Sequence, residues 1–310
     1  MYMKPSSGLI ILLFCTFWAK AQLTTQEKLG YAKDTRLLII HADDLGVAHS
    51  ENQAAIRSME KGSTSSASIM VPCPWFAEIA AYAVAHPKAD FGLHLTLTSE
   101  WKYYKWGPLT DETEAPGLVN KEGFLYESVD SLYRSVRPGS IEKELRKQIE
   151  KARQFGIDVT HFDSHMGALF NDATYLQLLI RLGREYKVPV FLARTGPSAA
   201  FNINLDSFLT EKDIMVDQVY TASPGDYKKG MAAYYTSALQ SMQPGLNIII
   251  MHTAYDDTEM QAITIDHPDW GAAWRQADFN FFTSDQCRKL LAEHNIRVIT
   301  WREVRDKLYR

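Results

Sequence analysis

Two adjacent carboxylates end an apolar run in the segment LLIIHADDLG, residues 37–46. Asp43 and Asp44 repel each other, and removing either charge from water is costly. A cation would compensate both charges, provided that other segments supply further ligands. One carboxylate can then bind the metal while its neighbour removes a proton from water. The pattern therefore indicates a divalent-metal site.

Other polar residues stand where further apolar runs end. They are His41, His94, His161, Asp163, His165, Arg194 and His252. Any one such histidine is more often a hydrogen-bonded core residue than a ligand, so the evidence lies in their number. Imidazole and carboxylate suit zinc and other transition metals, and three protein ligands leave positions open for water and substrate.

Apolar runs alternate with amphipathic segments along the chain. The pattern predicts strands over residues 37–41, 66–71, 91–97, 159–163, 188–193, 214–220, 246–252 and 297–300. It predicts helices over residues 50–61, 75–86, 140–155, 173–186, 227–242 and 284–294, the first with a capping box from Ser50 and Gln53.

Continuous apolar strands are buried on both faces, which indicates a parallel sheet covered by helices. We therefore expect an α/β fold with a (β/α) barrel-like sheet, which allows for an incomplete or distorted TIM-type barrel. A doubly wound open sheet is the alternative, although no dinucleotide-binding glycine motif follows the first strand. In a barrel the C-terminal ends of the strands share one face, where the polar residues would meet.

The first 21 residues have the three parts of a secretory signal peptide. Lys4 precedes an apolar run over residues 9–18, and Ala19-Lys20-Ala21 matches a cleavage site. The run is too short to span a bilayer comfortably. We expect cleavage before Gln22, a periplasmic or extracellular protein without a stable membrane span, and one catalytic domain over residues 22–310.

The composition limits the classes of partner. A formal net charge of −4 over 310 residues gives no electrostatic case for a nucleic-acid partner. Cys73 and Cys287 remain after cleavage, and the sequence leaves open whether they pair. The oligomeric state is also open, with a homodimer among the alternatives.

The segments HADDLG, STSSASIMV, FGLHLTLT and THFDSHMG occur in this order. Together they resemble the YdjC-like (ChbG/HpnK) carbohydrate deacetylase family, which is similar to the polysaccharide deacetylases. The resemblance continues through IIIMHTAY to the C-terminal segment WRQADFNFF. It implies a barrel-like fold with one divalent metal ion, zinc or magnesium. It also implies a hydrolase that removes N-acetyl groups from amino-sugar oligosaccharides, with metal-bound water as the nucleophile.

The resemblance also implies roles for individual residues. Asp44, His94 and His165 would bind the metal. Asp43 would be the general base, and His252 is a candidate general acid.

This chain departs from the family pattern at two places. MHTAY stands around His252 where relatives have a CHPGY-like segment, which affects the assignment of the acid. Met166, Gly167 and Ala168 follow His165 where many relatives carry further histidines. The second departure bears on the usual substrate more than on the metal.

A long aromatic segment, residues 98–138, follows the strand that carries His94. Loops of this length are more often functional than accidental, and aromatic rings stack on the apolar faces of sugars. Trp101 and Trp106, with Arg194 and Asp163, are therefore candidate substrate-binding residues. The alternative is that the rings only fasten the loop to the barrel.

Two other functions remain open at this stage. A glycoside hydrolase could use Asp43 and Asp163 as its carboxylate pair without a metal. A secreted, non-catalytic carbohydrate-binding protein could keep the same fold.

We predict that the mature chain begins at Gln22. Intact-mass measurement of the exported protein tests this, since cleavage removes residues 1–21. A mature chain that still carries these residues would contradict the prediction.

Overall fold

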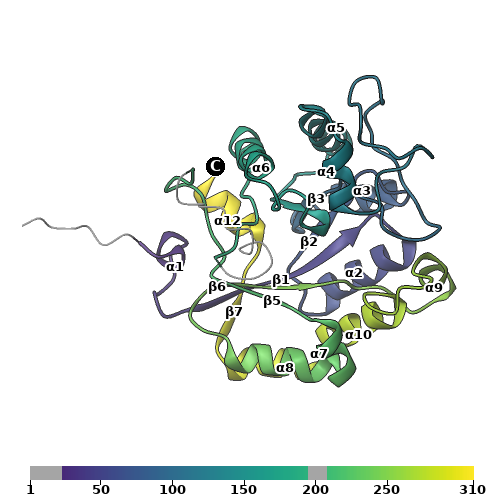
Figure 1. Cartoon of the computed structure of the whole chain (residues 1–310). Helices are drawn as coiled ribbons and strands as arrows, with labels where there is room; N and C mark the ends of the chain where they lie inside the picture. The colour runs from purple at the N-terminus through teal and green to yellow at the C-terminus, as the bar shows by residue number, and fades with distance from the viewer. Residues whose placement is uncertain (1–22, 195–207) are drawn as a thin grey trace, which may run out of the picture.

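The computed structural model describes residues 23–194 and 208–310, and Figure 1 shows their arrangement. The predicted signal peptide lies outside the described residues. The strands are β1 (Arg36–Leu45), β2 (Ser66–Ile69), β3 (Phe91–Leu95), β4 (Phe162–Ser164), β5 (Gln218–Thr221), β6 (Gly245–Met251) and β7 (Ile296–Val298). They form one parallel sheet in the order β4-β3-β2-β1-β6-β5, with β7 paired to β1.

Helices surround the strands on the outside (Figure 1). Those of the first half are α1 (Thr25–Lys28), α2 (His49–Lys61), α3 (Phe76–Ala85), α4 (Val129–Ser135), α5 (Ser140–Gln154) and α6 (Ala173–Tyr186). Those of the second half are α7 (Pro224–Lys229), α8 (Met231–Ser241), α9 (Thr258–Ile263), α10 (Ala272–Phe282), α11 (Asp285–Glu293) and α12 (Trp301–Leu308).

The sheet curls into a distorted (β/α) barrel, as the sequence predicts. Single backbone bridges continue it from β4 toward β5, joining Phe162 to Val190 and Ala193 to Val216. The predicted strand over residues 188–193 therefore contributes to the barrel through isolated bridges and not as a regular strand.

Strand β1 shows how the apolar runs build the core. Leu38 and Ile40 pack into the larger cluster, which includes the apolar faces of the covering helices. Leu37 and Ile39 point the other way, into a cluster with Val216, Leu246 and Trp301 that fills the barrel interior. Side chains alternate along a strand, so His41 and Asp43 also belong to the interior side. Burial of each such Leu or Ile side chain stabilises the folded state by about 1.5–3 kcal/mol.

Two local predictions are wrong. Helix α2 begins after Ala48 without a side-chain cap, because the Ser50 hydroxyl donates to the Tyr255 carbonyl instead of capping the helix. The single helix predicted over residues 227–242 is two helices, α7 and α8. Gly230 separates them with φ of 109°, a conformation that residues with a Cβ seldom adopt.

Two further observations answer points left open by the sequence. Cys73 and Cys287 are free, buried thiols. Within the described part of the chain, no helix is both long and apolar enough to cross a membrane.

Candidate active site

Asp43 and Asp44 lie at a bulge in β1. The pairing with β2 steps from Ala42–Ala67 to Leu45–Ile69, so β1 carries one extra residue here. Asp44 has φ of 71°, in the left-handed region that aspartate tolerates better than most residues. Neighbours on a regular strand point to opposite faces, whereas a bulge re-aims a side chain. This explains how both carboxylates reach one cavity.

Asp44, His94 and His165 converge from three different segments. Asp44 Oδ1 lies 3.4 Å from His94 Nε2 and 3.3 Å from His165 Nδ1. Among the residues that the structure describes, this buried oxygen has no hydrogen-bond partner, which would be costly without a ligand. Zinc bonds to nitrogen and carboxylate oxygen are about 2.0–2.2 Å long, so this spacing suits one shared ion. The three predicted ligands therefore fit a divalent cation.

Carboxylates hold the second nitrogen of each histidine ligand. Asp163 Oδ1 lies 2.7 Å from His94 Nδ1, and Glu100 Oε2 lies 3.0 Å from His165 Nε2. Such partners fix the orientation and tautomer of a metal-binding imidazole. Sequence reasoning missed Glu100, because a single glutamate in a loop carries no motif.

These carboxylates also make both imidazoles basic. Burial disfavours the imidazolium of His94, but Asp163 and Asp43 outweigh it and raise the pKa well above its usual value. Burial likewise opposes the charge on His165, while Glu100 and Asp44 raise its pKa to about 9. The negative charges around the two imidazoles thus favour a positive charge between them. A bound cation would replace the protons on the histidine nitrogens that bind it.

A buried arginine holds the other oxygen of Asp44. Arg275 Nη2 lies 2.8 Å from Asp44 Oδ2, and the same guanidinium pairs with the buried Glu51. Burial disfavours the Asp44 carboxylate, but Arg275, His165 and His94 hold its pKa well below the usual range. Asp44 therefore stays charged and presents Oδ1 to the cation site. Sequence reasoning missed Arg275 because it did not predict α10.

The candidate base and the candidate acid lie beside this site. Asp43 Oδ2 is 3.9 Å from His94 Nε2, and His252 Nε2 is 3.9 Å from Asp44 Oδ2. Burial lowers the pKa of His252 to about 4, so its imidazole is neutral. The backbone N–H of His252 donates to Asp278, which anchors this segment after β6.

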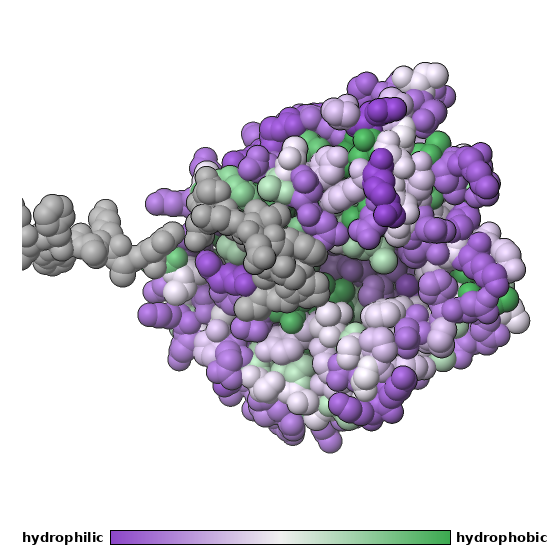
Figure 2. Space-filling model, in the orientation of Figure 1, coloured by the Kyte–Doolittle hydropathy of each residue, from purple (hydrophilic) through white to green (hydrophobic). Residues whose placement is uncertain are grey.

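These residues line a cavity of about 580 Å³. Its polar floor is formed by Asp43, Asp44, His94, Asp163, His165, His252 and Arg275, and Glu100 and Trp101 also line it. Its apolar lining consists of Met166, Phe170, Phe191, Val219 and Ile250. The outer surface in Figure 2 is mostly hydrophilic, with a recess near the middle of the view.

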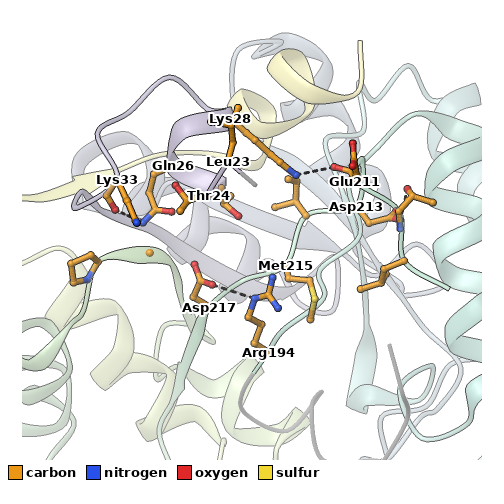
Figure 3. A pocket seen from close by; sticks show the side chains of 16 residues that line it. Leu23, Thr24, Gln26, Lys28, Lys33, Arg194, Glu211, Asp213, Met215 and Asp217 are labelled. Carbon is orange, nitrogen blue, oxygen red and sulfur yellow. Dashed lines mark hydrogen bonds and ion pairs between the residues drawn. The ribbon is translucent and has the colours of Figure 1, made fainter. Parts of the chain in front are cut away.

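The structure does not bring Arg194 to this cavity, which corrects its predicted role. Arg194 Nε lies 3.4 Å from Asp217 Oδ1, and the side chain lines a separate cavity with Lys28 and Glu211 (Figure 3). The reason is the irregular backbone of residues 188–194, whose end does not direct Arg194 to the face shared by the regular strands.

Trp106, which the sequence suggested as a substrate-binding residue, does not line this cavity. Only 3% of Trp106 is exposed, and its indole N–H donates to the Thr98 carbonyl. Trp106 and Tyr104 fasten the long loop to the barrel, while Trp101 lines the cavity with its ring 5.4 Å from the Arg275 guanidinium. Asp163 reaches the cavity, but its oxygens are engaged by His94 and His41.

The chain is similar in sequence to known proteins over most of its length. A family model described as YdjC-like protein matches residues 37–293. A carbohydrate deacetylase from Thermus thermophilus is 31% identical over 287 residues, which cover 91% of this chain and 98% of that protein. A carbohydrate deacetylase from Thermoanaerobacter pseudethanolicus is 26% identical over 261 residues, covering 84% and 96%.

Among solved structures, a candidate cellobiose-phosphate cleavage protein from Enterococcus faecalis is similar in fold. Its TM-score is 0.72 at 21% identity, and the match covers 86% of this chain and 98% of that one.

We predict that His94→Ala and His165→Ala lose the bound cation, because each removes one of three ligands. Glu100→Gln should weaken metal affinity by roughly 10–100-fold, since it releases the His165 ring. Metal analysis after dialysis and calorimetric titration measure both effects, with the exposed His86→Ala as control. Unchanged stoichiometry in both histidine variants would show that the cation is held elsewhere.

Proposed function

Because the chain belongs to the YdjC-like protein family, we propose that it is a metal-dependent enzyme that hydrolyses the N-acetyl amides of amino-sugar oligosaccharides. The relatives confirm the predicted enzyme class, a carbohydrate deacetylase. The observation that carries the metal-dependent mechanism is the unpartnered Asp44 Oδ1 facing His94 Nε2 and His165 Nδ1. Imidazole donors favour zinc, and magnesium remains the alternative.

A divalent cation at this site supplies Lewis acidity, which polarises an amide carbonyl and activates water near neutral pH. Asp43 Oδ2 accepts the proton of the attacking water, because it lies beside the cation site while Oδ1 is held by His41. The Arg275 guanidinium keeps Asp44 ionised throughout.

His252 lines the cavity beside the cation site and is the candidate for protonating the leaving nitrogen. Its imidazole is neutral, so the proton that Asp43 takes from the water must pass to His252 before His252 can give it to the leaving nitrogen. His252 Nε2 lies 3.9 Å from Asp44 Oδ2, and His252 lines the same cavity as Asp43. We therefore assign the general acid to His252 Nε2.

The glycosidase alternative has less support. It needs Asp163 as a free carboxylate, but both oxygens of Asp163 are engaged, by His94 Nδ1 at 2.7 Å and His41 Nε2 at 3.0 Å. A non-catalytic binding protein would have no need for the full set of ligands and base. We also propose that the enzyme acts after export, on the strength of the N-terminal sequence alone.

We predict that Asp43→Asn keeps its metal and loses activity by about 10²–10⁴-fold, the usual contribution of a general base. Released acetate and metal content are measured together, with the exposed Asp285→Asn as control. A chelator should abolish wild-type activity, and added zinc should restore it.

Two results would contradict this prediction. Loss of metal in Asp43→Asn would mean that the roles of Asp43 and Asp44 are reversed. Activity that resists chelation would favour the metal-free glycosidase.

We further predict faster acetate release from short N-acetylated oligosaccharides than from the monosaccharide, because Trp101 lines the cavity that holds the cation site and can stack on a sugar ring. Trp101→Ala should lower kcat/KM for the oligosaccharide by about 2–10-fold, the size of one aromatic contact, with metal content unchanged. Trp106→Ala should leave kcat/KM unchanged, and both substitutions should reduce stability by up to about 3–5 kcal/mol, because both side chains are buried.

The effect on kcat/KM for the oligosaccharide therefore separates the two tryptophan variants. Equal turnover of monomer and oligomer, together with an unaffected Trp101→Ala, would show that the loop takes no part in binding.

A further inference from the structure

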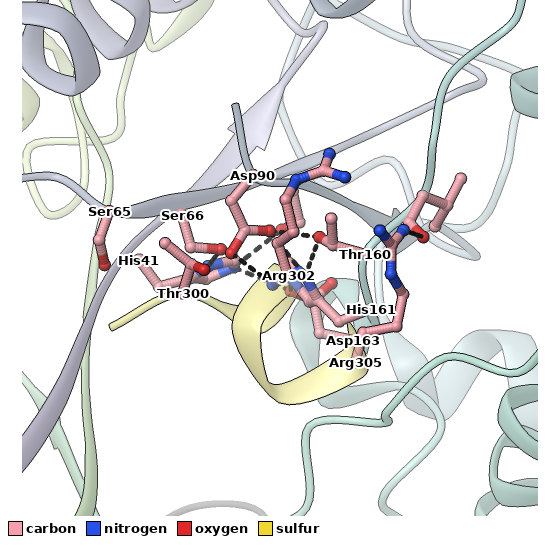
Figure 4. Close-up of polar contacts among 12 residues, drawn as sticks. His41, Ser65, Ser66, Asp90, Thr160, His161, Asp163, Thr300, Arg302 and Arg305 are labelled. Carbon is pink, nitrogen blue, oxygen red and sulfur yellow. Dashed lines mark hydrogen bonds and ion pairs between the residues drawn. The ribbon is translucent and has the colours of Figure 1, made fainter. Parts of the chain in front are cut away.

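His41 is a buried histidine that contacts the candidate base and has no proton-transfer step in the proposed reaction. Its Nε2 lies 3.0 Å from Asp43 Oδ1 and 3.0 Å from Asp163 Oδ2. The residue is 1% exposed, and Figure 4 shows it among the polar contacts around Asp163. One nitrogen therefore contacts both the candidate base and the carboxylate that orients a metal ligand.

The ring of His41 is held at both nitrogens. Nδ1 lies 3.0 Å from Ser66 Oγ, its register partner on β2, and Nε2 lies 3.2 Å from Ser68 Oγ. The Ser68 hydroxyl also donates to Asp43 Oδ1 at 3.4 Å. The ring packs edge-on against His161 with centroids 5.0 Å apart. These contacts restrict rotation of the imidazole.

The buried negative charges of the neighbouring carboxylates are a second reason for a histidine at position 41. Asp43 and Asp163 are both buried, and two buried carboxylates need a positive partner. Burial opposes the imidazolium of His41, but Asp163 and Asp43 outweigh it and raise the pKa to about 9. Charge-assisted hydrogen bonds are stronger and more directional than neutral ones.

We propose that His41 is a positioning residue for Asp43. It holds Oδ1, so that Oδ2 faces the cation site and takes the proton of the attacking water. The same imidazole also contacts Asp163, which contacts His94. These contacts fix the position of the base relative to the metal ligand. The inference rests on the proposed role of Asp43 as general base.

One competing role comes from the same cluster. Donor atoms of His41, His161 and Asp163 lie within 4.8 Å of one another, and His161 Nε2 has no hydrogen-bond partner among the described residues. A second cation bound there would make His41 a ligand. Metal stoichiometry distinguishes this from positioning.

The test combines His41→Gln with Asp43→Asn. Glutamine offers an N–H donor without the charge or ring of histidine. We expect His41→Gln to keep the metal content and KM of the wild type while kcat falls roughly 10–100-fold, as for other residues that orient a catalytic group. In the Asp43→Asn background, the same substitution should change the residual kcat by less than about twofold, because no base remains to be positioned.

Two further variants keep the test decisive. Ser66→Ala leaves His41 in place and frees Nδ1, so it should lower kcat in the wild type and not in Asp43→Asn, even if His41→Gln folds poorly. His86→Gln, an exposed histidine stacked on Tyr82, is the matched control and should leave kcat unchanged.

The outcomes separate this inference from the proposed function. An equal fold-loss in both backgrounds, or loss of metal in His41→Gln, would overturn the positioning role. If Asp43→Asn is inactive but neither His41→Gln nor Ser66→Ala lowers kcat, only the inference fails. If Asp43→Asn is fully active, the proposed function itself fails.

Discussion

Buried negative charge is the constraint on which the site depends. Asp43, Asp44 and Asp163 are all at most 9% exposed. Carboxylates in such surroundings persist as anions only when cations or strong donors accompany them. The chain supplies Arg275 and several imidazoles for this purpose. Asp44 Oδ1 is one of the buried carboxylate oxygens without a hydrogen-bond partner within the described residues, and it faces two ligand nitrogens.

The fold meets this constraint through the geometry of one strand. Alternation along β1 places His41 and Asp43 on the interior side, while the bulge with φ of 71° at Asp44 turns the next carboxylate toward the same cavity. The neighbouring strands then supply the partners, because parallel strands end on one face of the barrel. A regular strand would leave Asp44 on the helix side, away from His94 and His165.

A cluster of buried residues around His161 contacts Asp163 and so adjoins the site. His161 stacks on Trp301 at 5.4 Å, and its Nδ1 lies 2.9 Å from Thr160 Oγ1, which in turn hydrogen-bonds to Asp90 (Figure 4). Gly92 on β3 makes room for this ring, since a Cβ there would lie 2.3 Å from His161 Cε1. Close packing of this kind transmits the position of one side chain to the next.

The sequence by itself determined which residues are candidates for the chemistry and that they lie at or after the ends of buried strands. Asp43, Asp44, His94 and His165 could be selected because apolar runs mark buried strands, and because parallel strands end on a common face. The boundaries of α6, residues 173–186, also follow from local periodicity alone. The order of the four motifs along the chain also indicated the resemblance to the YdjC-like family.

Only the tertiary structure decided the partners of these residues. Arg275 reaches Asp44 across 231 positions and Glu51 across 224, and Glu100 reaches His165 across 65. No local period encodes such contacts, because they depend on how distant segments pack. The same reason explains why Trp101 lines the cavity while Trp106 is buried in the loop, and why Arg194 points to another cavity. Side-chain direction there is set by irregular backbone, which apolar patterning does not predict.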